Sequence, residues 1–466
     1  MNSRSRSKKK PNERATVPAR RGRTKLLAIL AILALVAAAC TSETTDTTDA
    51  PSGTDAPAGT DAPDTTSGGD EQIDLSIIVT RDYYIPPDEF ESFMAEYPNI
   101  NVTWDVQSND DILQQLLTRV DAGQPLPDVL GAEDAFLIEA FVEAGLVGSH
   151  DDIAATWEAE DPDQYGLLLP LVWDETALDG TKYGASITAN FDVLYYNQEW
   201  FDEAGVSVPF ESLDDVLDAM RAMKATRPDS IPFTVQAKAG DGVTTMKTVL
   251  AAAGTPFEGA VPDLTSAGGL YACNWFLQAA NEGLLPPDAI AWGEDESRGA
   301  FVSGDAGLIL DGFTTAGDFS EAEGFAYPDQ WNLTPVPLSQ SGGGADGVAL
   351  SAARTWAVIE GSEHPAEAAL VLRYIAETAN LLGQAGNGGV PMRQTEALNS
   401  PELVDIWPFF NEDLKNAYLG SSPTPAGPNA GEVEGILEQM FGEIVVGTDK
   451  TCDDLAAEYQ PQLDSA

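Results

Sequence analysis

Eight acidic, amide and aromatic residues follow buried stretches of the sequence, at positions where strands of a sheet are expected to end. Carboxylates and amides bind pairs of hydroxyl groups, and aromatic rings pack against the C–H faces of sugar rings. These side chains therefore fit a binding site for a hydroxyl-rich molecule, and the alternative at each position is a turn residue or a core aromatic. The candidates are Tyr83, Tyr84, Glu133, Asp134, Asn190, Trp292, Asp311 and Phe313.

The sequence carries no signature of catalysis. It contains no G-x-S-x-G, no phosphate-binding loop and no H-E-x-x-H motif. Acidic residues are so numerous that no catalytic pair of carboxylates stands out. The two histidines, His150 and His364, lack the spacing of metal ligands. We therefore expect a binding protein without catalytic residues, metal or cofactor.

The charge balance argues against two further kinds of partner. The 466 residues include 24 Lys and Arg against 75 Asp and Glu, a formal net charge of −51. Such a surface repels the phosphates of nucleic acid and of anionic lipid headgroups. Neither nucleic acid nor a bare lipid surface is therefore expected to bind directly.

Strands and helices alternate in the first part of the globular region. The pattern predicts strands at 73–80, 100–106 and 127–130, and helices at 87–97, 110–122 and 135–144. This order implies parallel strands, and ligands bind beyond the carboxyl ends of such strands. Residues 131–134, which include Glu133 and Asp134, are expected to form a loop at that edge.

The stretch 179–206 is expected to carry the chain from one sheet to another. Asp179-Gly180 predicts a tight turn, because glycine tolerates the positive φ that such turns demand. Two β-rich runs, 183–187 and 191–196, are separated by the segment Thr188–Asn190. A helix that ends at Gly205 follows. Further on, the pattern predicts one helix over 365–380 and an amphipathic helix over 432–446.

Several of these stretches resemble the family of extracellular solute-binding proteins for carbohydrate uptake, to which the maltose-binding protein belongs. The segment 179–205 carries D-G, K-Y-G, Y-Y-N and F-x-x-A-G in the order of that family, and the strand before Glu133 follows L-P-D-V. Similar patterns recur at Ala300–Gly304, at Gly388–Pro391 and after Gly447. The resemblance covers about residues 73–456 and rests on the order of these motifs.

The resemblance implies an α/β fold of the two-lobed periplasmic-binding-protein type, with a hinge of three crossing segments near 188–190, 335–337 and 388–391. Lobe 1 would hold residues 72–188 and 337–388, and lobe 2 would hold residues 189–336 and 389–456. It also implies a monomeric substrate-binding component of an ABC importer, which captures a sugar or oligosaccharide and delivers it to the permease. The alternatives are a binding protein for another polar solute, such as a polyamine or peptide, and a surface glycoside hydrolase.

The N-terminal region predicts export and a lipid anchor. Residues 1–40 combine a basic start, the apolar run Leu26–Ala39 and Cys40, which resembles the lipidated cysteine of a bacterial lipobox. Lipidation would hold the protein at the outer face of the cell membrane, and a plain secreted protein is the alternative. Residues 41–71 repeat Thr-Asp-Ala-Pro and predict a disordered tether.

Two further cysteines, Cys273 and Cys452, remain for the exported part of the chain. An even number of cysteines in an oxidising compartment favours a disulfide between them. Two unpaired, buried thiols are the alternative.

Overall fold

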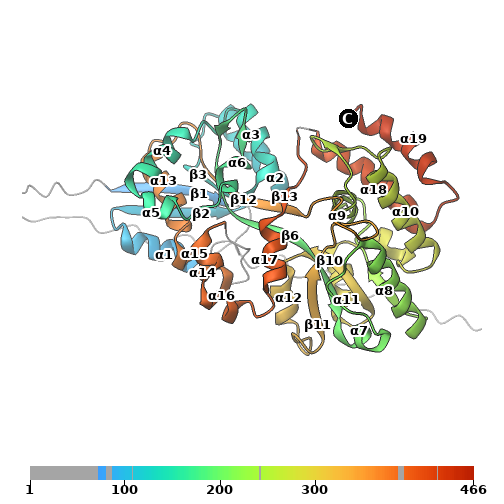
Figure 1. Cartoon of the computed structure of the whole chain (residues 1–466). Helices are drawn as coiled ribbons and strands as arrows, with labels where there is room; N and C mark the ends of the chain where they lie inside the picture. Colours follow the sequence, from blue (N-terminus) through green and yellow to red (C-terminus); the bar gives the residue numbers. More distant parts are fainter. Residues whose placement is uncertain (1–71, 80–86, 108, 241–242, 387–392, 428) are drawn as a thin grey trace, which may run out of the picture. The chain divides into compact units, whose positions relative to one another are not determined.

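The computed structural model describes residues 72–79, 87–107, 109–240, 243–386, 393–427 and 429–466 (Figure 1). The predicted signal peptide, Cys40 and the tether lie outside these ranges, as do Tyr83, Tyr84 and the crossing segment Gly388–Pro391. None of the helices within them is long and apolar enough to cross a membrane.

The first strands form a parallel layer, as their alternation with helices predicts. Strand β1 (Ile73–Val79) pairs in parallel with both β2 (Ile100–Val106) and β3 (Val129–Asp134). Helices α1 (Pro87–Glu96) and α2 (Asn109–Asp121) form the connections. The predicted loop at residues 131–134 is wrong: β3 continues to Asp134 because this segment is buried and pairs with β12 (Leu350–Val358).

A series of short elements leads from β3 to the central strand. They are η2 (Ala135–Leu137), α3 (Ile138–Glu143), α4 (Asp151–Glu160), α5 (Pro162–Tyr165), α6 (Leu171–Asp174), β4 (Ala177–Leu178) and β5 (Thr181–Lys182). Strands β4 and β5 form a hairpin, and its two turn residues, Asp179 and Gly180, have φ values of 51° and 84°. The predicted tight turn is therefore confirmed.

Strand β6 (Ala185–Asn197) is continuous for 13 residues, so the predicted break at Thr188–Asn190 is wrong. The strand continues because these residues pair with Ala352–Arg354 of β12. In Figure 1 it runs from the strands around β12 to β10 (Ala306–Gly312) and β11 (Trp331–Pro335), which pair with its second half. Strand β7 (Ile231–Thr234) lies beyond β10 in the same sheet. The expected passage between two groups of strands thus takes place within a single strand.

The remaining helices cover these strands and form the C-terminal part of the chain. They are α7 (Gln198–Ala204), α8 (Leu213–Thr226), α9 (Thr244–Ala252), α10 (Ala267–Asn281), η3 (Pro287–Ala291), α11 (Glu294–Val302), α12 (Thr315–Glu321), α13 (Pro365–Ile375), α14 (Thr378–Gly386), α15 (Thr395–Leu398), α16 (Pro401–Ile406), α17 (Glu412–Leu419), α18 (Ala430–Val446) and α19 (Cys452–Leu463). Three short strands, β8 (Phe257–Glu258), β9 (Val261–Pro262) and β13 (Ser422–Pro423), complete the set. The prediction of a single helix over 365–380 is wrong: α13 ends at Ile375, and a second helix, α14, begins at Thr378.

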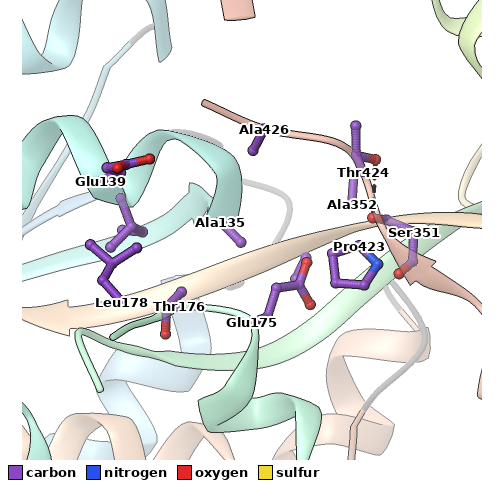
Figure 2. A pocket seen from close by; sticks show the side chains of 12 residues that line it. Ala135, Glu139, Glu175, Thr176, Leu178, Ser351, Ala352, Pro423, Thr424 and Ala426 are labelled. Atoms are coloured by element: carbon purple, nitrogen blue, oxygen red, sulfur yellow. Dashed lines mark hydrogen bonds between the residues drawn. The ribbon is translucent and has the colours of Figure 1, made fainter. Parts of the chain in front are cut away.

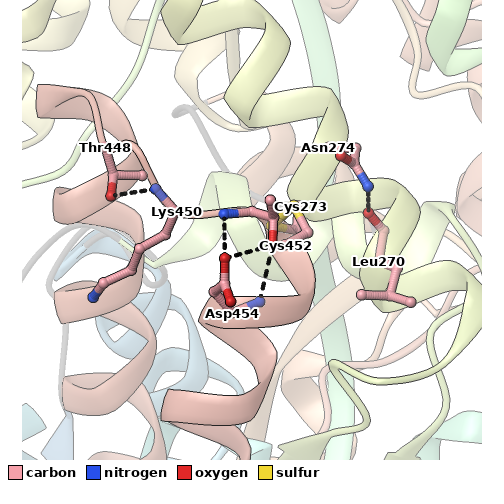
Figure 3. Close-up of a disulfide and its surroundings, with 8 residues drawn as sticks. Leu270, Cys273, Asn274, Thr448, Lys450, Cys452 and Asp454 are labelled. Atoms are coloured by element: carbon pink, nitrogen blue, oxygen red, sulfur yellow. Dashed lines mark hydrogen bonds between the residues drawn. A yellow bond between two sulfur atoms is a disulfide. The ribbon is translucent and has the colours of Figure 1, made fainter.

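Helices α10, α18 and α19 pack against one another around a buried cluster that includes Phe276 and Phe441. A disulfide joins Cys273 of α10 to Cys452 at the start of α19, and the Cα atoms of the two residues are 5.8 Å apart (Figure 3). The bond connects the last helix to an element that lies 179 residues earlier in the chain.

Candidate ligand-binding site

A pocket of about 90 Å³ lies where three segments that are distant in sequence meet (Figure 2). One wall comes from η2 and α3, the second from the chain between α6 and the β4 hairpin, and the third from β12 and the segment that follows β13. The lining residues are Ala135, Ile138, Glu139, Glu175, Thr176, Leu178, Ser351, Ala352, Ala353, Pro423, Thr424 and Ala426.

Backbone pairing builds the third wall, which comes from β12 and the segment after β13. Strand β13 lies parallel to the start of β12, with Ser351 opposite Pro423. The N–H of Thr424 then donates to the carbonyl oxygen of Ser351 at 2.8 Å and continues this contact. Because Ala352 pairs with Asn190 of β6 in the antiparallel ladder, the pocket lies beside the central strand.

The carboxylate of Glu175 is held in this pocket by a buried arginine. The side chain of Glu175 is 4% exposed and pairs with the guanidinium group of Arg393, which is 2% exposed. Burial raises the pKa of Glu175 above its ordinary value, while the charge of Arg393 and the N–H of Ala353 oppose that rise. The pairing of β6 with β12 skips Ile187, whose carbonyl oxygen accepts a hydrogen bond from the Arg393 N–H at 2.8 Å. This bond fixes the position of Arg393.

The three hydroxyl groups that line the pocket are already hydrogen-bonded to the backbone. The hydroxyl of Thr176 donates to the carbonyl oxygen of Gly184 at 2.8 Å. That of Ser351 donates to the carbonyl oxygen of Ser422 at 3.3 Å, and that of Thr424 to the carbonyl oxygen of Ser351 at 3.1 Å. These bonds orient the hydroxyls and leave their lone pairs available.

Glu133 and Asp134 are buried at the end of β3 and do not line the pocket. Asp134 forms an ion pair with Arg354 of β12, which is itself buried. One carboxylate oxygen of Glu133 accepts the N–H of Asp134 at 2.9 Å. In this structure both acids support the contact between β3 and β12.

The structure brings Asn190, Asp311 and Phe313 together where β6 meets the end of β10. The Oδ1 atom of Asn190 accepts the N–H of Thr314 at 3.2 Å. Asp311 forms an ion pair with Arg298, with 2.7 Å between a carboxylate oxygen and Nε. The ring of Phe313 is buried and stacks on Phe191 with 5.2 Å between their centroids. Of the three side chains, that of Asn190 is the least buried.

Asp192 lies two residues after Asn190 on the same face of β6. The hydroxyl of Thr248 on α9 donates to its carboxylate. Burial raises the pKa of Asp192 to about 6, the charge of Asp311 adds to that rise, and the Thr248 bond and Lys247 oppose it. Lys247 itself pairs with Glu434 of α18 at 2.7 Å.

Trp292 packs against a different hydrophobic cluster from the one that contains Phe313. It follows η3, packs half-buried against the cluster around α10 and α18, and its carbonyl oxygen accepts the N–H of Ala237 at 3.3 Å. Tyr83 and Tyr84 lie outside the described residues.

The residues that do line the pocket were not found from the sequence. Glu139 lies five residues after Asp134, the observed end of β3, on the first turn of α3, so the search for polar residues directly after strands did not include it. No local pattern marks Glu175, Ser351 or Thr424, because only the fold brings them together. Within the described ranges, no group of three or more His, Cys, Asp or Glu side chains is arranged to hold a metal ion.

Comparisons with known proteins place these features in context. The family model for bacterial extracellular solute-binding proteins matches residues 78–381. A putative binding protein of Brucella abortus is 25% identical over 224 residues, which make up 47% of this chain and 52% of the relative. A mannitol-binding protein of Pseudomonas aeruginosa is 25% identical over 252 residues, 50% of this chain and 55% of the relative. The chain thus spans about half the length of these curated relatives.

The likeness to solved structures extends over more of the chain. The sugar-binding protein MalE of Xanthomonas citri matches with a TM-score of 0.69 at 16% identity, covering 84% of this chain and 98% of that chain. This match confirms the predicted α/β, two-lobed periplasmic-binding fold.

Proposed function

The chain belongs to the family of bacterial extracellular solute-binding proteins, and from that premise we propose that it captures a sugar or oligosaccharide for an ABC importer. Members of this family bind solutes and are not enzymes. The observation that carries the proposal is the pocket beside β6, whose polar lining consists of two carboxylates and three hydroxyls. Such groups bind the hydroxyls of a sugar. The mannitol-binding relative supports a ligand of this chemistry.

The mechanism that we propose follows from the passage of β6 between two groups of strands. Lobe 1 (72–188 and 337–388) and lobe 2 (189–336 and 389–456) would move about the crossings at 188–190, 335–337 and 388–391. A ligand held between the lobes stabilises the closed arrangement because it contacts both only in that state. The membrane permease would recognise the closed form and accept the ligand from it.

We further propose that the protein acts as a monomer at the outer face of the cell membrane. Diacylation of Cys40 would anchor it, and residues 41–71 would act as a spacer. A flexible chain of thirty residues spans about 30 Å on average, so such a spacer would separate the folded part from the bilayer.

A thermal-shift screen of the purified chain against a panel of sugars and sugar alcohols tests the proposed ligand class. A ligand that binds only the folded state raises the melting temperature as its concentration rises. We expect at least one sugar to do so, and titration calorimetry then gives its affinity. Shifts with peptides or polyamines, and with no sugar, would contradict the proposal. Chromatography of the bound sugar after long incubation excludes hydrolysis if the sugar is recovered intact.

A further inference from the structure

The described side chains that line the pocket offer hydrogen-bond acceptors and no free donors. Its hydroxyl groups, on Thr176, Ser351 and Thr424, each donate to a backbone carbonyl oxygen. A hydroxyl has one proton to donate and two lone pairs, so each of these groups can still accept a hydrogen bond. The remaining polar side chains are the carboxylates of Glu139 and Glu175, which are acceptors only.

The two carboxylates differ in how their charge is balanced. Glu175 pairs with Arg393 and accepts the N–H of Ala353. Glu139, on the first turn of α3, forms no ion pair or hydrogen bond with the part of the chain that the structure describes. Figure 2 shows its carboxylate at the side of the pocket opposite Thr424 and Ser351. The lining therefore carries one negative charge without a counter-charge from the described residues.

The described lining also lacks a ring that would stack on a sugar and a cation that would balance an anionic ligand. No Lys, Arg, His or aromatic residue is among the described residues that line it. The nearby Arg354 and Arg393 are each paired with an acid, Asp134 and Glu175 respectively. Among the described lining residues, a sugar ring finds no aromatic face to pack on, and a ligand carboxylate or phosphate finds no unpaired cation.

A ligand that pairs with these described side chains must supply the hydrogen-bond donors. Each neutral hydroxyl brings lone pairs as well as a proton, and a buried lone pair without a donor loses its hydration. An ammonium group has three donors and no acceptor, so it fits an acceptor-only wall without that loss. It would also balance the charge of Glu139.

We propose that the ligand is a hydroxylated molecule with a single ammonium group, an amino sugar or amino polyol, whose nitrogen contacts Glu139. This assignment rests on the proposed sugar-binding function and narrows it to one substrate class. The ligand hydroxyls donate to Glu175, Thr176, Ser351 and Thr424. The net charge of −51 adds a long-range attraction that concentrates cationic ligands near the protein.

Matched pairs of ligands test this assignment. The probes are glucosamine with glucose, galactosamine with galactose, and glucamine with sorbitol, each titrated calorimetrically into the purified chain at pH 7. We expect the amine of at least one pair to bind about tenfold or more tightly than its neutral counterpart, because an opposite charge in a half-buried site attracts strongly. That preference should fall as the salt concentration rises.

Two variants of acidic residues on α3 test whether Glu139 is the source of the preference for the amine. Glu139→Gln keeps the size of the side chain and removes its charge, so the preference for the amine should fall to about threefold or less. Glu143→Gln makes the same change on the exposed end of α3, outside the pocket, and should leave the preference intact. Circular dichroism and melting temperature verify that both variants are folded.

Each outcome bears on a different claim. If a neutral sugar binds as tightly as its amine, the ammonium assignment is overturned while the sugar-binding function stands. If Glu139→Gln retains the full preference for the amine, the assignment to Glu139 is overturned. If neither member of any pair binds and the wider sugar panel also fails, the proposed function falls and the inference falls with it.

Discussion

The guanidinium group of Arg393 forms a buried ion pair with the carboxylate of Glu175, so the segment that carries Arg393 is tied to a wall of the pocket. Its backbone N–H reinforces the connection by donating to Ile187 of β6. A buried charge whose partner is removed cannot be rehydrated, which makes this contact sensitive to single substitutions.

Arg393→Met should lower the free energy of unfolding by about 3–5 kcal/mol, because it leaves the Glu175 carboxylate buried without a cation. Urea denaturation at pH 7 measures the change. Arg373→Met is the control, since Arg373 pairs with Glu160, whose side chain is 60% exposed, and should cost about 1 kcal/mol or less. The double variant Arg393→Met with Glu175→Leu should recover much of the loss. Equal effects of the two single arginine variants would contradict a structural role for the buried pair.

The raised pKa of Asp192 predicts that the free energy of unfolding depends on pH. Its pKa is raised to about 6 by burial, whereas an unfolded aspartate titrates near pH 4, about 3.9. The folded state thus binds the proton more tightly, so the stabilisation is full below pH 4 and is lost as the pH rises through 6. Relative to Asp192→Asn, the wild type should lose at most about 3 kcal/mol between pH 4 and pH 7.

Urea denaturation at pH 4, 5, 6 and 7 tests this prediction. Asp229→Asn, which changes an exposed aspartate before β7, should follow the wild-type profile. If Asp192→Asn shows the same pH profile as the wild type, the carboxylate does not hold a proton in the folded state at these pH values.

The parallel strands were predictable because they depend on local patterns. Strand β2 and helix α2 follow hydrophobic periodicities that a short window reveals, and their bounds match the prediction within one residue. The continuation of β3 to Asp134 and of β6 through Thr188–Asn190 depends instead on pairing with β12, which is far away in sequence. Polar residues at these positions favour loops by local pattern, although a partner strand can satisfy their backbone groups within a sheet.

The position of β2 at the edge of the sheet explains another difference between the prediction and the structure. The apolar pattern around Trp104 predicts a core residue, and Trp104 does share a face of β2 with the buried Ile100 and Val102, but it is 36% exposed. Strand β2 ends the sheet order, so within the described residues no further strand covers its outer side. The ring stacks on Phe90 with 5.0 Å between centroids. The residues that line the pocket are also hard to predict from the sequence. Glu175 and Thr424 line the same pocket only because β13 pairs with β12.

Reduction of the Cys273–Cys452 disulfide should destabilise the chain by about 2–4 kcal/mol, because the reduced unfolded chain gains conformational freedom. The bond connects α10 to α19. Melting temperatures with and without a reductant measure the effect, and the Cys273→Ala, Cys452→Ala double variant should melt at the lower temperature under both conditions. Two reactive thiols after denaturation without reductant would refute the bond.

Cys40→Ala should release the protein from the membrane, if diacylation of Cys40 is the anchor. Fractionation of cells that produce the wild type and the variant compares the amounts in the membrane and in the medium. Mass spectrometry of the wild type should find the diacylglycerol group on the N-terminal peptide. A variant that stays fully in the membrane fraction would exclude this anchor.

Substitutions of Asn190 test whether a residue at the β6 crossing contacts the ligand. The Oδ1 atom of Asn190 accepts the N–H of Thr314 at 3.2 Å, and its side chain occupies the space over Gly312, where an added Cβ would clash with Nδ2. The Oδ1 atom thus has a structural role, whereas Nδ2 is the atom that could donate to a ligand hydroxyl. A substitution that separates these two atoms distinguishes ligand binding from a backbone role.

Asn190→Asp keeps the acceptor for Thr314 and removes the donor, while Asn190→Ala removes both. If Nδ2 binds the ligand, both variants should lose about 1–3 kcal/mol of binding free energy, roughly 5- to 150-fold in affinity. Only Asn190→Ala should then also lower the melting temperature, because it alone leaves the Thr314 N–H without its partner. Calorimetric titration with the ligand found in the screen measures affinity, and thermal unfolding measures stability. An unchanged affinity in Asn190→Asp would exclude a contact from Nδ2 and leave Asn190 with the backbone role that its bond to Thr314 already supports.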